Sequence, residues 1–397
     1  MAAIYMDANA TTPVLPEVVE AMRPYWTESF GNASSVHQRG QQARAAVDQA
    51  RESVAALLHC RAAEVVFTSG GTESDNLALF GLLTPGDHLI TTAIEHHAIL
   101  HAADALAERG VEVTFLQPTG QGIVEPAALQ AALRPNTRLV SVMLANNETG
   151  VIQPVRELAQ LAHTARALFH TDAIQAAGKL SLDVASLGCD LLSLSGHKMH
   201  APQGTGVLYV RRGLKLNPLF FGGLHERGRR PGTENVAGIA GLGCAAELAH
   251  AWLTAPSETT ADPAAPPENP AALAALRDRL EKGIVARVPE AGVNGAGASR
   301  VANTANLYFD GIDAEALIIA LDLKGLAVSA GSACQSGATE PSHVLVAMGL
   351  SDTRARASVR FSLSRLNTES EVDTVLEIIP AAVARLRELT PVKPMTA

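Results

Sequence analysis

Short apolar runs alternate with helical patterns through the first half of the chain. Residues 65–68, 88–92 and 111–116 have the length and composition of buried strands, whereas 38–58 repeats apolar residues at the spacing of a helix. The same series continues with segments expected at 75–83, 98–109, 126–133, 138–144 and 155–168. Such alternation predicts a mostly parallel sheet with helices on both faces, in which ligands gather at the carboxyl ends of the strands.

A change of composition separates this pattern from a second one. Residues 254–270 are rich in Pro, Ala, Ser and Thr and have no apolar period, which predicts a flexible surface linker at a domain boundary. The segments expected beyond it are helix 271–288, strand 304–309, helix 313–323, strand 358–363 and a final helix. We therefore expect a large domain at 13–253, a linker or insertion at 254–270, and a smaller α/β domain formed by 1–12 and 271–397.

Composition narrows the class of protein. The 397 residues are 47% hydrophobic and 18% charged, as in ordinary globular proteins, and the formal net charge of -9 makes nucleic acid an unexpected partner. We find no apolar run near the roughly 18 residues of a membrane span and no signal pattern at the amino terminus, so we expect a cytoplasmic protein without a membrane partner. The four cysteines lack C-x-x-C spacing, which indicates neither a zinc site nor a disulfide framework.

One lysine stands where two apolar runs meet. The run 191–194 stops at S-G-H-K, which ends at Lys198, and a turn rich in glycine separates it from the run 207–210. A lysine held among small and polar residues is partly desolvated, which lowers its pKa and frees the amine to form a Schiff base, the chemistry of a pyridoxal phosphate lysine. Taken alone, a lysine beside a turn is more often a solvated surface residue.

Other segments offer the groups that such a cofactor needs. The first strand runs into S-G-G-T-E-S, where Gly71, Thr72 and a helix amino terminus form a candidate phosphate cup, although a Gly-Gly turn alone is more often a tight connection. Asp172 follows a strand and could keep a pyridine nitrogen protonated or cap the next helix. His96 is placed to lie against a flat ring, and Asn147 could bond a phenolic oxygen or form an Asx turn.

Three other patterns bear on the chemistry. His97 and His101 are four residues apart, as metal ligands on a helix are, but no third ligand is evident, so we expect a solvated helix start and no metal. Thr233 has the residue type of a helix N-cap. Cys334 lies in 329–338, a run of small residues that makes a poor packing element and a good mobile arm.

Together these segments resemble the cysteine desulfurases of the NifS/IscS type, class-V aminotransferases among the fold type I pyridoxal phosphate-dependent transferases. The resemblance runs along nearly the whole chain and is carried by D-A-N-A-T-T-P, F-T-S-G-G-T-E-S-D-N, E-H-H-A-I-L, N-N-E-T-G, H-T-D-A-I-Q, S-G-H-K, R-P-G-T-E-N, G-S-A-C-Q-S and S-V-R-F-S-L. It implies an α/β fold with a large, mostly parallel domain and a smaller carboxyl-terminal α/β domain. It also implies conversion of L-cysteine to L-alanine with transfer of sulfur to an enzyme cysteine.

The resemblance implies a role in cofactor binding for each of several residues. Lys198 would bind pyridoxal phosphate as a Schiff base, His96 would stack on the ring and assist proton transfer, and Asp172 would pair with the pyridine nitrogen. The ring oxygen would be contacted by Asn147 and Gln175. The phosphate would be held by Gly71, Thr72, Ser195 and His197, joined by Thr233 from the second subunit of a homodimer.

Substrate roles are implied in the same way. Arg360, with Asn147 beside it, would clamp the carboxylate of L-cysteine as a bidentate fork, and Cys334 would take the sulfur as a persulfide. The sulfur would pass to an acceptor protein such as an iron–sulfur scaffold, or serve other thio-cofactors. Residues 254–270 are longer than this family usually carries, and the chain lacks the extended tail with which IscS-type members meet their scaffold, so the acceptor stays open.

Three other functions compete with cysteine desulfuration. An aminotransferase needs no thiol on a mobile loop, so Cys334 argues against that activity. A selenocysteine lyase would use the same site, and the sequence does not separate the two substrates. A scaffold that only binds partners would have a damaged site, whereas here every role is filled.

Overall fold

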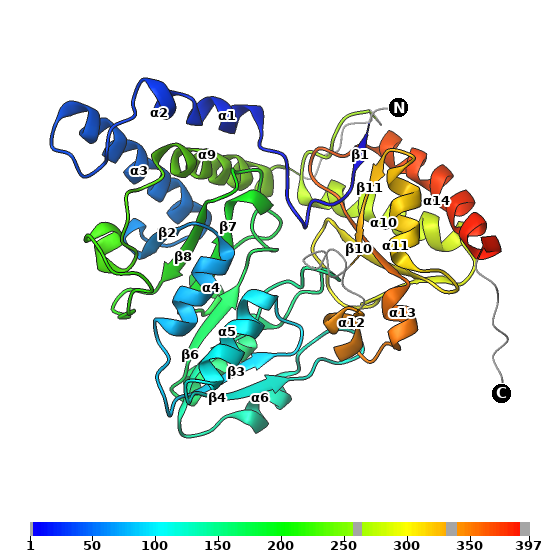
Figure 1. The fold of residues 1–397 in the computed structure, drawn as a ribbon, viewed down its shortest axis with the longest axis horizontal. Coiled ribbons are helices and arrows are strands. Elements are labelled where there is room, and N and C mark those ends of the chain that lie inside the picture. Colours follow the sequence, from blue (N-terminus) through cyan, green and yellow to red (C-terminus); the bar gives the residue numbers. More distant parts are fainter. Residues whose placement is uncertain (1–2, 257–263, 331–339, 390–397) are drawn as a thin grey trace.

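A computed structural model describes residues 3–256, 264–330 and 340–389, and Figure 1 shows two units lying side by side. The larger unit holds a seven-stranded sheet in the order β2-β8-β7-β6-β5-β3-β4. Its strands are β2 Val65–Thr68, β3 His88–Thr92, β4 Glu112–Leu116, β5 Thr137–Ser141, β6 Leu168–Asp172, β7 Leu191–Ser195 and β8 Gly206–Val210. β8 runs antiparallel to both neighbours and the other pairs are parallel, which confirms the mostly parallel sheet.

Helices cover both faces of this sheet. They are α1 Pro16–Met22, α2 Pro24–Thr27, α3 Gln38–Leu57, α4 Gly71–Phe80, α5 His97–Ala107, α6 Pro126–Ala132, α7 Val155–Thr164, α8 Val184–Leu187 and α9 Val236–Leu253, with short 3-10 helices η1 Ala62–Glu64, η2 Gly196–Lys198 and η3 His225–Gly228. Alternate residues of a strand point to opposite sides of a sheet. In β2, Val65 and Phe67 pack in the cluster that includes α3 residues, whereas Val66 packs with residues of α4 and α5. Both faces are therefore buried.

α9 is a long helix rich in Ala and Gly. Val236–Leu253 has 18 residues with a mean hydropathy of 1.4, so it reaches the length and composition of a membrane span, and the expectation that no segment comes near one is wrong. In the structure 56% of it is buried, and it packs against α3 and α1. Gly243 permits the close approach, because a Cβ there would lie 2.6 Å from Ala50 Cα. These contacts are those of a core helix.

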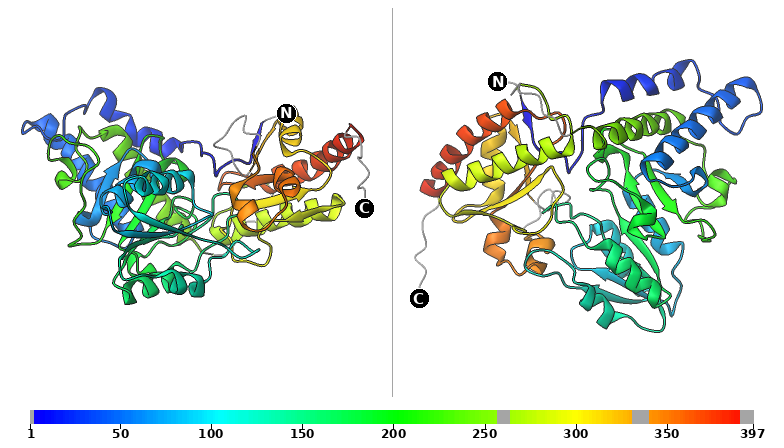
Figure 2. Two further views of the ribbon diagram at one scale, coloured as in Figure 1. Left: turned by 60° about the horizontal axis from the view of Figure 1, so that its bottom comes forward. Right: turned by 180° about the vertical axis from the view of Figure 1, so that it is seen from behind.

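The smaller unit is built on an antiparallel sheet in the order β12-β13-β10-β9. Its elements are β9 Ala291–Val293, β10 Thr304–Phe309, β11 Leu326–Ala327, β12 Ser329–Ala330, β13 Ser358–Ser362, α10 Pro270–Arg287, α11 Ala314–Asp322, α12 His343–Ala347, α13 Asp352–Arg356 and α14 Glu369–Leu389. β1 Ile4–Tyr5 pairs in parallel with β11, so the amino terminus joins this unit, as both views of Figure 2 show. Residues of α10, α11, α14 and the strands share one apolar core.

The segment expected to be a linker falls between α9, which ends at Leu253, and α10, which begins at Pro270. Its described ends are held by hydrogen bonds. Asn269 caps α10 by accepting from the Ala272 N–H and donates from Nδ2 to the Pro256 carbonyl at 2.7 Å. The described flanks are therefore more ordered than their composition suggested, whereas 257–263 lie outside the described residues. The division into two domains at this segment stays a prediction.

Three expected element boundaries are corrected. α4 begins at Gly71 instead of residue 75, which brings the helix amino terminus to the glycine turn itself. The expected helix 155–168 ends at Thr164, and Leu168 already begins β6. The cap of α9 is Asn235, whose side chain accepts from the Gly238 N–H, so the expectation that Thr233 is the cap is wrong.

Candidate active site

A cavity of about 330 Å³ lies where the carboxyl ends of the large sheet meet the smaller unit. Ten residues predicted for the site line it: Gly71, Thr72, His96, Asn147, Asp172, Gln175, Ser195, His197, Lys198 and Arg360. The other lining residues are Asn9, Ala10, His97, Met143, Glu148, Ile174 and His343. The structure therefore brings together polar groups from most of the strand ends that the sequence singled out.

Lys198 ends η2, directly after β7. Its Nζ donates hydrogen bonds to the carbonyl oxygens of Asn9 and Ala10, both at 2.6 Å. The segment that follows β1 thus forms a wall of the cavity. The turn before the lysine is tight, because a Cβ on Gly196 would lie 2.4 Å from Thr205 Oγ1.

The turn between β2 and α4 has the geometry of an anion cup. α4 begins at Gly71 without a side-chain cap, so the first N–H groups of the helix and its positive dipole end face the cavity edge. The approach is close: a Cβ on Gly71 would lie 2.1 Å from Ile174 Cδ1, and a Cβ on Gly206 would lie 2.6 Å from Gly70 Cα. A methyl group at Gly71 would therefore displace the Ile174 side chain, and one at Gly206 would displace the Gly70 backbone.

Glu73 would oppose an anion if its charge were unpaired. Its carboxylate instead accepts from the Ser69 N–H at 2.7 Å and from Arg230 Nε at 2.8 Å. These bonds lower the pKa of Glu73 despite its partial burial, which acts the other way and is the largest single influence. Arg230 thus balances the one acidic side chain in the first turn of α4.

Asp172 ends β6 with its carboxyl group buried. Oδ1 accepts from the Ile174 N–H at 2.8 Å, and burial raises the pKa of Asp172 to about 6. Burial and the nearby Asp172 also raise the pKa of Asp75 well above its usual value. Beneath them, His170 bonds Ser141 Oγ and Ser193 Oγ, and burial lowers its pKa to about 3. A cationic ring nitrogen beside Asp172 would favour the ionised carboxylate.

His96 is the N-cap of α5. Its Nδ1 accepts from the Ala98 N–H at 3.1 Å, so this nitrogen carries a lone pair and the neutral ring has its proton on Nε2. Burial, followed by the charge of Lys198, lowers the pKa of His96 to about 4. The ring is therefore neutral at physiological pH, which suits a ring placed flat against a cofactor.

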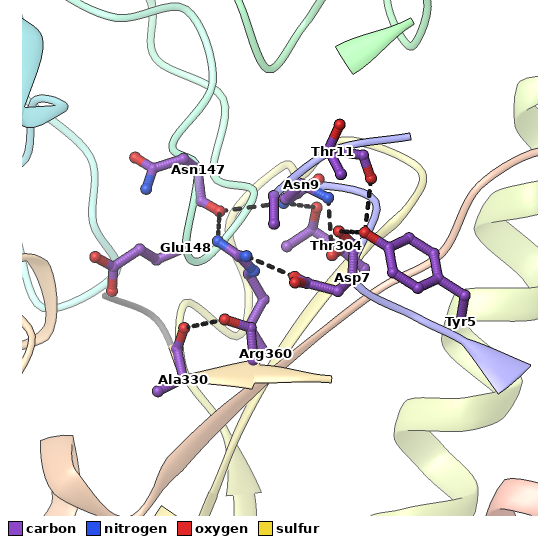
Figure 3. Close-up of polar contacts among 12 residues, drawn as sticks. Tyr5, Asp7, Asn9, Thr11, Asn147, Glu148, Thr304, Ala330 and Arg360 are labelled. Carbon is purple, nitrogen blue, oxygen red and sulfur yellow. Dashed lines mark hydrogen bonds and ion pairs between the residues drawn. The ribbon is translucent and has the colours of Figure 1, made fainter. Parts of the chain in front are cut away.

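Arg360 is the largest fully buried side chain and is only 2% exposed. Figure 3 shows its guanidinium between the Asn147 carbonyl, which accepts from Nη1 at 2.9 Å, and Asp7 Oδ1, which accepts from Nη2 at 2.8 Å. Within the described part of the chain, Arg360 Nε and Asn147 Oδ1 are buried without a hydrogen-bond partner. Two unsatisfied polar atoms in one cavity wall indicate a polar ligand.

Sequence reasoning missed two residues that organise the site. Asn9 uses its side-chain amide fully: Nδ2 donates to the Asn147 carbonyl and Thr304 Oγ1, while Oδ1 accepts from Lys179 and Asn303. Lys179 also donates to Gln175 Oε1 at 2.9 Å, and burial, followed by Lys198 and Arg360, lowers its pKa well below the usual value. The polar motif around Asn9 was the only feature of the sequence that pointed to either residue, and no pattern around Lys179 indicated that it is buried near the site.

Of the two remaining predicted residues, one lies away from the cavity and the other is outside the described residues. Thr233 is exposed and away from the lining, as a residue serving a second subunit would be. Cys334 lies in 331–339, outside the described residues. The described chain on either side reaches the site, because Ser329 pairs with Arg360 across the sheet and His343 lines the cavity.

His343 also bears on the question of a metal. Its ring lies 4.7 Å from that of His97, which lies 5.1 Å from that of His101 (centroid distances), so a third histidine is present that the sequence did not reveal. His343 Nε2 is 2.9 Å from the Glu95 carbonyl and must donate to it. Among the described residues, no group of three or more ligating side chains has the geometry to hold a metal ion.

Comparison with known proteins decides the family. Residues 4–375 match the aminotransferase class-V family. The chain belongs to this family. A relative in it, cysteine desulfurase IscS of Methanosarcina thermophila, is 46% identical over 396 residues, covering 99% of this chain and 95% of the relative.

Solved structures agree with this class-V assignment. A NifS-like protein is 34% identical with a TM-score of 0.88, covering 97% of this chain and 100% of that one. SspA in complex with cysteine is 36% identical with a TM-score of 0.78, covering 91% and 98%. These likenesses confirm the expected fold type I architecture, and proteins of this family use pyridoxal phosphate.

The residues present fit that cofactor. The cavity volume lies in the range of small-molecule sites, and it holds a lysine amine, an uncapped helix amino terminus and a buried carboxyl group on separate strand ends. Asn147 Oδ1 is buried and lacks a partner among the described residues, and the amide nitrogen could equally occupy that position, so it suits a ring oxygen. Each polar group of pyridoxal phosphate therefore has a complementary group here.

Proposed function

We propose that this class-V protein is a pyridoxal phosphate-dependent cysteine desulfurase, which converts L-cysteine to L-alanine and passes the sulfur to one of its own cysteines. The observation that carries the proposal is the convergence of Lys198, the α4 cup and Asp172 with the buried Arg360 on one cavity. The relatives named cysteine desulfurase at nearly full coverage support the same reaction.

The cofactor would be held by four kinds of contact. Lys198 would provide the covalent attachment, Asp172 would keep the pyridine nitrogen protonated, and His96 would stack on the ring. The ring oxygen would contact Asn147 and Gln175. The phosphate would be bound by the α4 cup at Gly71 and Thr72, by Ser195 and His197, and by Thr233 of a second subunit. When bound, pyridoxal phosphate supplies an electron sink for the substrate Cα.

The substrate roles follow from the remaining groups. Arg360 would bind the carboxylate of L-cysteine with Asn147 beside it, which fixes the orientation of the Cα–H bond. The Lys198 amine would accept the Cα proton. His96 contributes as a neutral ring, since its pKa of about 4 keeps it unprotonated. Cys334 would attack the substrate sulfur as a thiolate and retain it as a persulfide.

The sulfur acceptor is proposed only as a class of protein. An acceptor protein such as an iron–sulfur scaffold, in the cytoplasm, would remove sulfur from Cys334, and other thio-cofactor pathways would be served in the same way. The relative from Methanosarcina thermophila is named IscS, which supports the link to sulfur mobilisation. The preference for cysteine over selenocysteine rests on the relatives' names and on the structure of SspA with cysteine.

A homodimer is part of the proposal. Large apolar side chains are exposed on α2 and the loop after it, and on the connection between β8 and α9: Trp26, Phe30, Phe220, Phe221 and Leu224. A contact of 3.3 Å between Ser34 Oγ and His225 Nε2 joins these loops. Exposed apolar patches of this kind mark protein interfaces, and Thr233 lies on the same connection as Phe221. Phe221→Asp should shift the protein toward monomer in analytical ultracentrifugation, and an unchanged dimer would exclude this patch.

The test of the reaction is product formation. Purified protein loaded with pyridoxal phosphate, given L-cysteine and a reductant, should release alanine and sulfide in equal amounts. Cys334→Ala should bind the cofactor normally and yield almost none of either product. Cys60→Ala is the matched control, because burial raises the pKa of the Cys60 thiol to about 12 and makes it a poor nucleophile. Alanine production by Cys334→Ala at the wild-type rate would contradict the proposed sulfur acceptor.

A further inference from the structure

The Arg360 guanidinium already has an ionic partner in this chain. Asp7 Oδ1 accepts from Nη2 at 2.8 Å, and the two side chains are 18% and 2% exposed respectively. Figure 3 shows this pair on one side of the guanidinium and the Asn147 carbonyl on the other. Arg360 therefore meets a carboxylate before any substrate binds.

Asp7 is held firmly in this position by its backbone. It forms a parallel bridge with Ser362, the last residue of β13, and its carbonyl accepts from Tyr5 Oη at 3.0 Å. Tyr5 Oη also contacts the Thr11 carbonyl at 2.9 Å, so one hydroxyl group ties both ends of the turn. The carboxylate of Asp7 is thus carried on a braced segment rather than on a free loop.

Burial explains why such a partner is needed. A guanidinium that is 2% exposed has lost nearly all contact with water, and a buried charge without a counter-charge is strongly unfavourable. Asn147 supplies only a neutral carbonyl, and Nε has no partner among the described residues. Asp7 is therefore the carboxylate paired directly with Arg360 in the absence of substrate. The other nearby acid, Glu148, bonds Ser342, and burial raises its pKa more strongly than the charge of Arg360 lowers it.

We propose that Asp7 is the resident counter-ion of Arg360 and sets the affinity of the site for carboxylates. It is a positioning residue that aims the guanidinium and neutralises it until the substrate carboxylate arrives. When that happens, two carboxylates share one guanidinium, and their mutual repulsion weakens substrate binding. The inference rests on the proposed function, because it takes Arg360 as the group that binds the substrate carboxylate.

Loss of the Asp7 charge should change carboxylate affinity in the opposite direction to the loss of a purely structural residue. Removing the charge of Asp7 while keeping its shape leaves Arg360 uncompensated, so the free protein should be less stable but should bind carboxylates more tightly. If Asp7 only supports the fold, the same change should lower both stability and affinity. The two quantities measured together therefore separate the roles.

Asp7→Asn is the variant that makes this change, since its Oδ1 can still accept from Nη2. Wild type and variant, both loaded with pyridoxal phosphate, are titrated with L-alanine, which has the substrate's carboxylate and no thiol, and the Kd is read from the cofactor absorbance. We expect a Kd at least threefold lower for Asp7→Asn, a lower melting temperature without ligand, and a larger upward shift on adding L-alanine. Asp310→Asn, which breaks the partly exposed Arg354–Asp310 pair, should leave the Kd unchanged.

The outcomes are distinguishable. Equal or weaker binding by Asp7→Asn, with normal binding by wild type, overturns this inference and leaves the proposed function standing. Absence of L-alanine binding by loaded wild type contradicts the proposed function and this inference with it. If Asp7→Asn does not fold, the double variant Asp7→Asn/Arg360→Gln decides: its folding would identify the uncompensated guanidinium as the cause, and its failure would show that Asp7 serves only the fold.

Discussion

Asn9 connects the two units more completely than any pattern in the sequence indicated. Its side chain makes four hydrogen bonds, to the Asn147 carbonyl, Thr304 Oγ1, Lys179 Nζ and Asn303 Nδ2, and the last three are buried. Asn147 and Lys179 belong to the larger unit, whereas Thr304 and Asn303 belong to the smaller one. Asn9→Ala removes all four bonds at once and should loosen the seam on which the cavity lies.

The size of the loss follows from what each partner keeps. The Asn147 carbonyl still accepts from Arg360, Lys179 still donates to Gln175, and Asn303 still donates to the Leu363 carbonyl. No partner is left wholly unsatisfied, so the full penalty for a buried orphan does not apply. At a net value of about 1 kcal/mol for each hydrogen bond, the variant should lose about 3 to 4 kcal/mol of unfolding free energy.

Urea denaturation of the cofactor-loaded proteins, at one protein concentration, measures this loss. Asn136→Ala is a matched control: Asn136 also donates two hydrogen bonds, to the Gly86 carbonyl and Glu112 Oε1, but it is exposed. Its removal should cost about 0.5 kcal/mol or less. A loss for Asn9→Ala within about 1 kcal/mol of the control would refute the view that this amide joins the units, since four net bonds of typical strength would then be missing.

Two further predictions concern the pH dependence of stability caused by the buried His170 and the N-cap of α10, Asn269. Burial lowers the pKa of His170 to about 3 from an ordinary 6.5, so below pH 6.5 the unfolded chain binds a proton there that the folded protein excludes. His170→Gln removes this penalty, so the unfolding free energy of the variant minus that of wild type should rise by about 2 kcal/mol when the pH falls from 7.5 to 5. Chemical denaturation at the two pH values measures this difference, and a difference that does not change with pH would contradict the prediction. Asn269→Ala should cost about 1 to 2 kcal/mol, through the lost cap of α10 and the lost bond to Pro256, and no loss would show that these flanks are loose.

The sequence predicted those parts of the site that follow strand ends. Asp172 ends β6, Lys198 closely follows β7 and Asn147 lies in the loop after β5, and a parallel sheet collects such ends at one edge. β2, β3 and β10 have the predicted bounds, because turn residues on both sides of a short apolar run define where the strand begins and ends. Gly71 lines the cavity, and its helix begins there instead of at the predicted residue 75.

The rest depended on tertiary contacts that leave no local pattern. Lys179 lies in an ordinary-looking segment, and only the fold shows that it is buried against Asn9. Asp7 and Arg360 are separated by most of the chain and meet because β1 joins the smaller unit. The helix α9 was expected, but its apolar character was underestimated, because its Gly residues interrupt any continuous apolar run although the helix packs closely against α3.

Lys198, as the residue that would bind pyridoxal phosphate, is the centre of the proposed chemistry. Borohydride reduction of the loaded protein, followed by proteolysis and mass spectrometry, locates the lysine that carries the cofactor. Lys179 is a stringent internal comparison, since it is buried nearby and its pKa is lowered well below the usual value. We predict the label on the peptide containing Lys198, and its loss in Lys198→Ala. A label on Lys179 or on any other lysine of the wild-type protein would contradict the account.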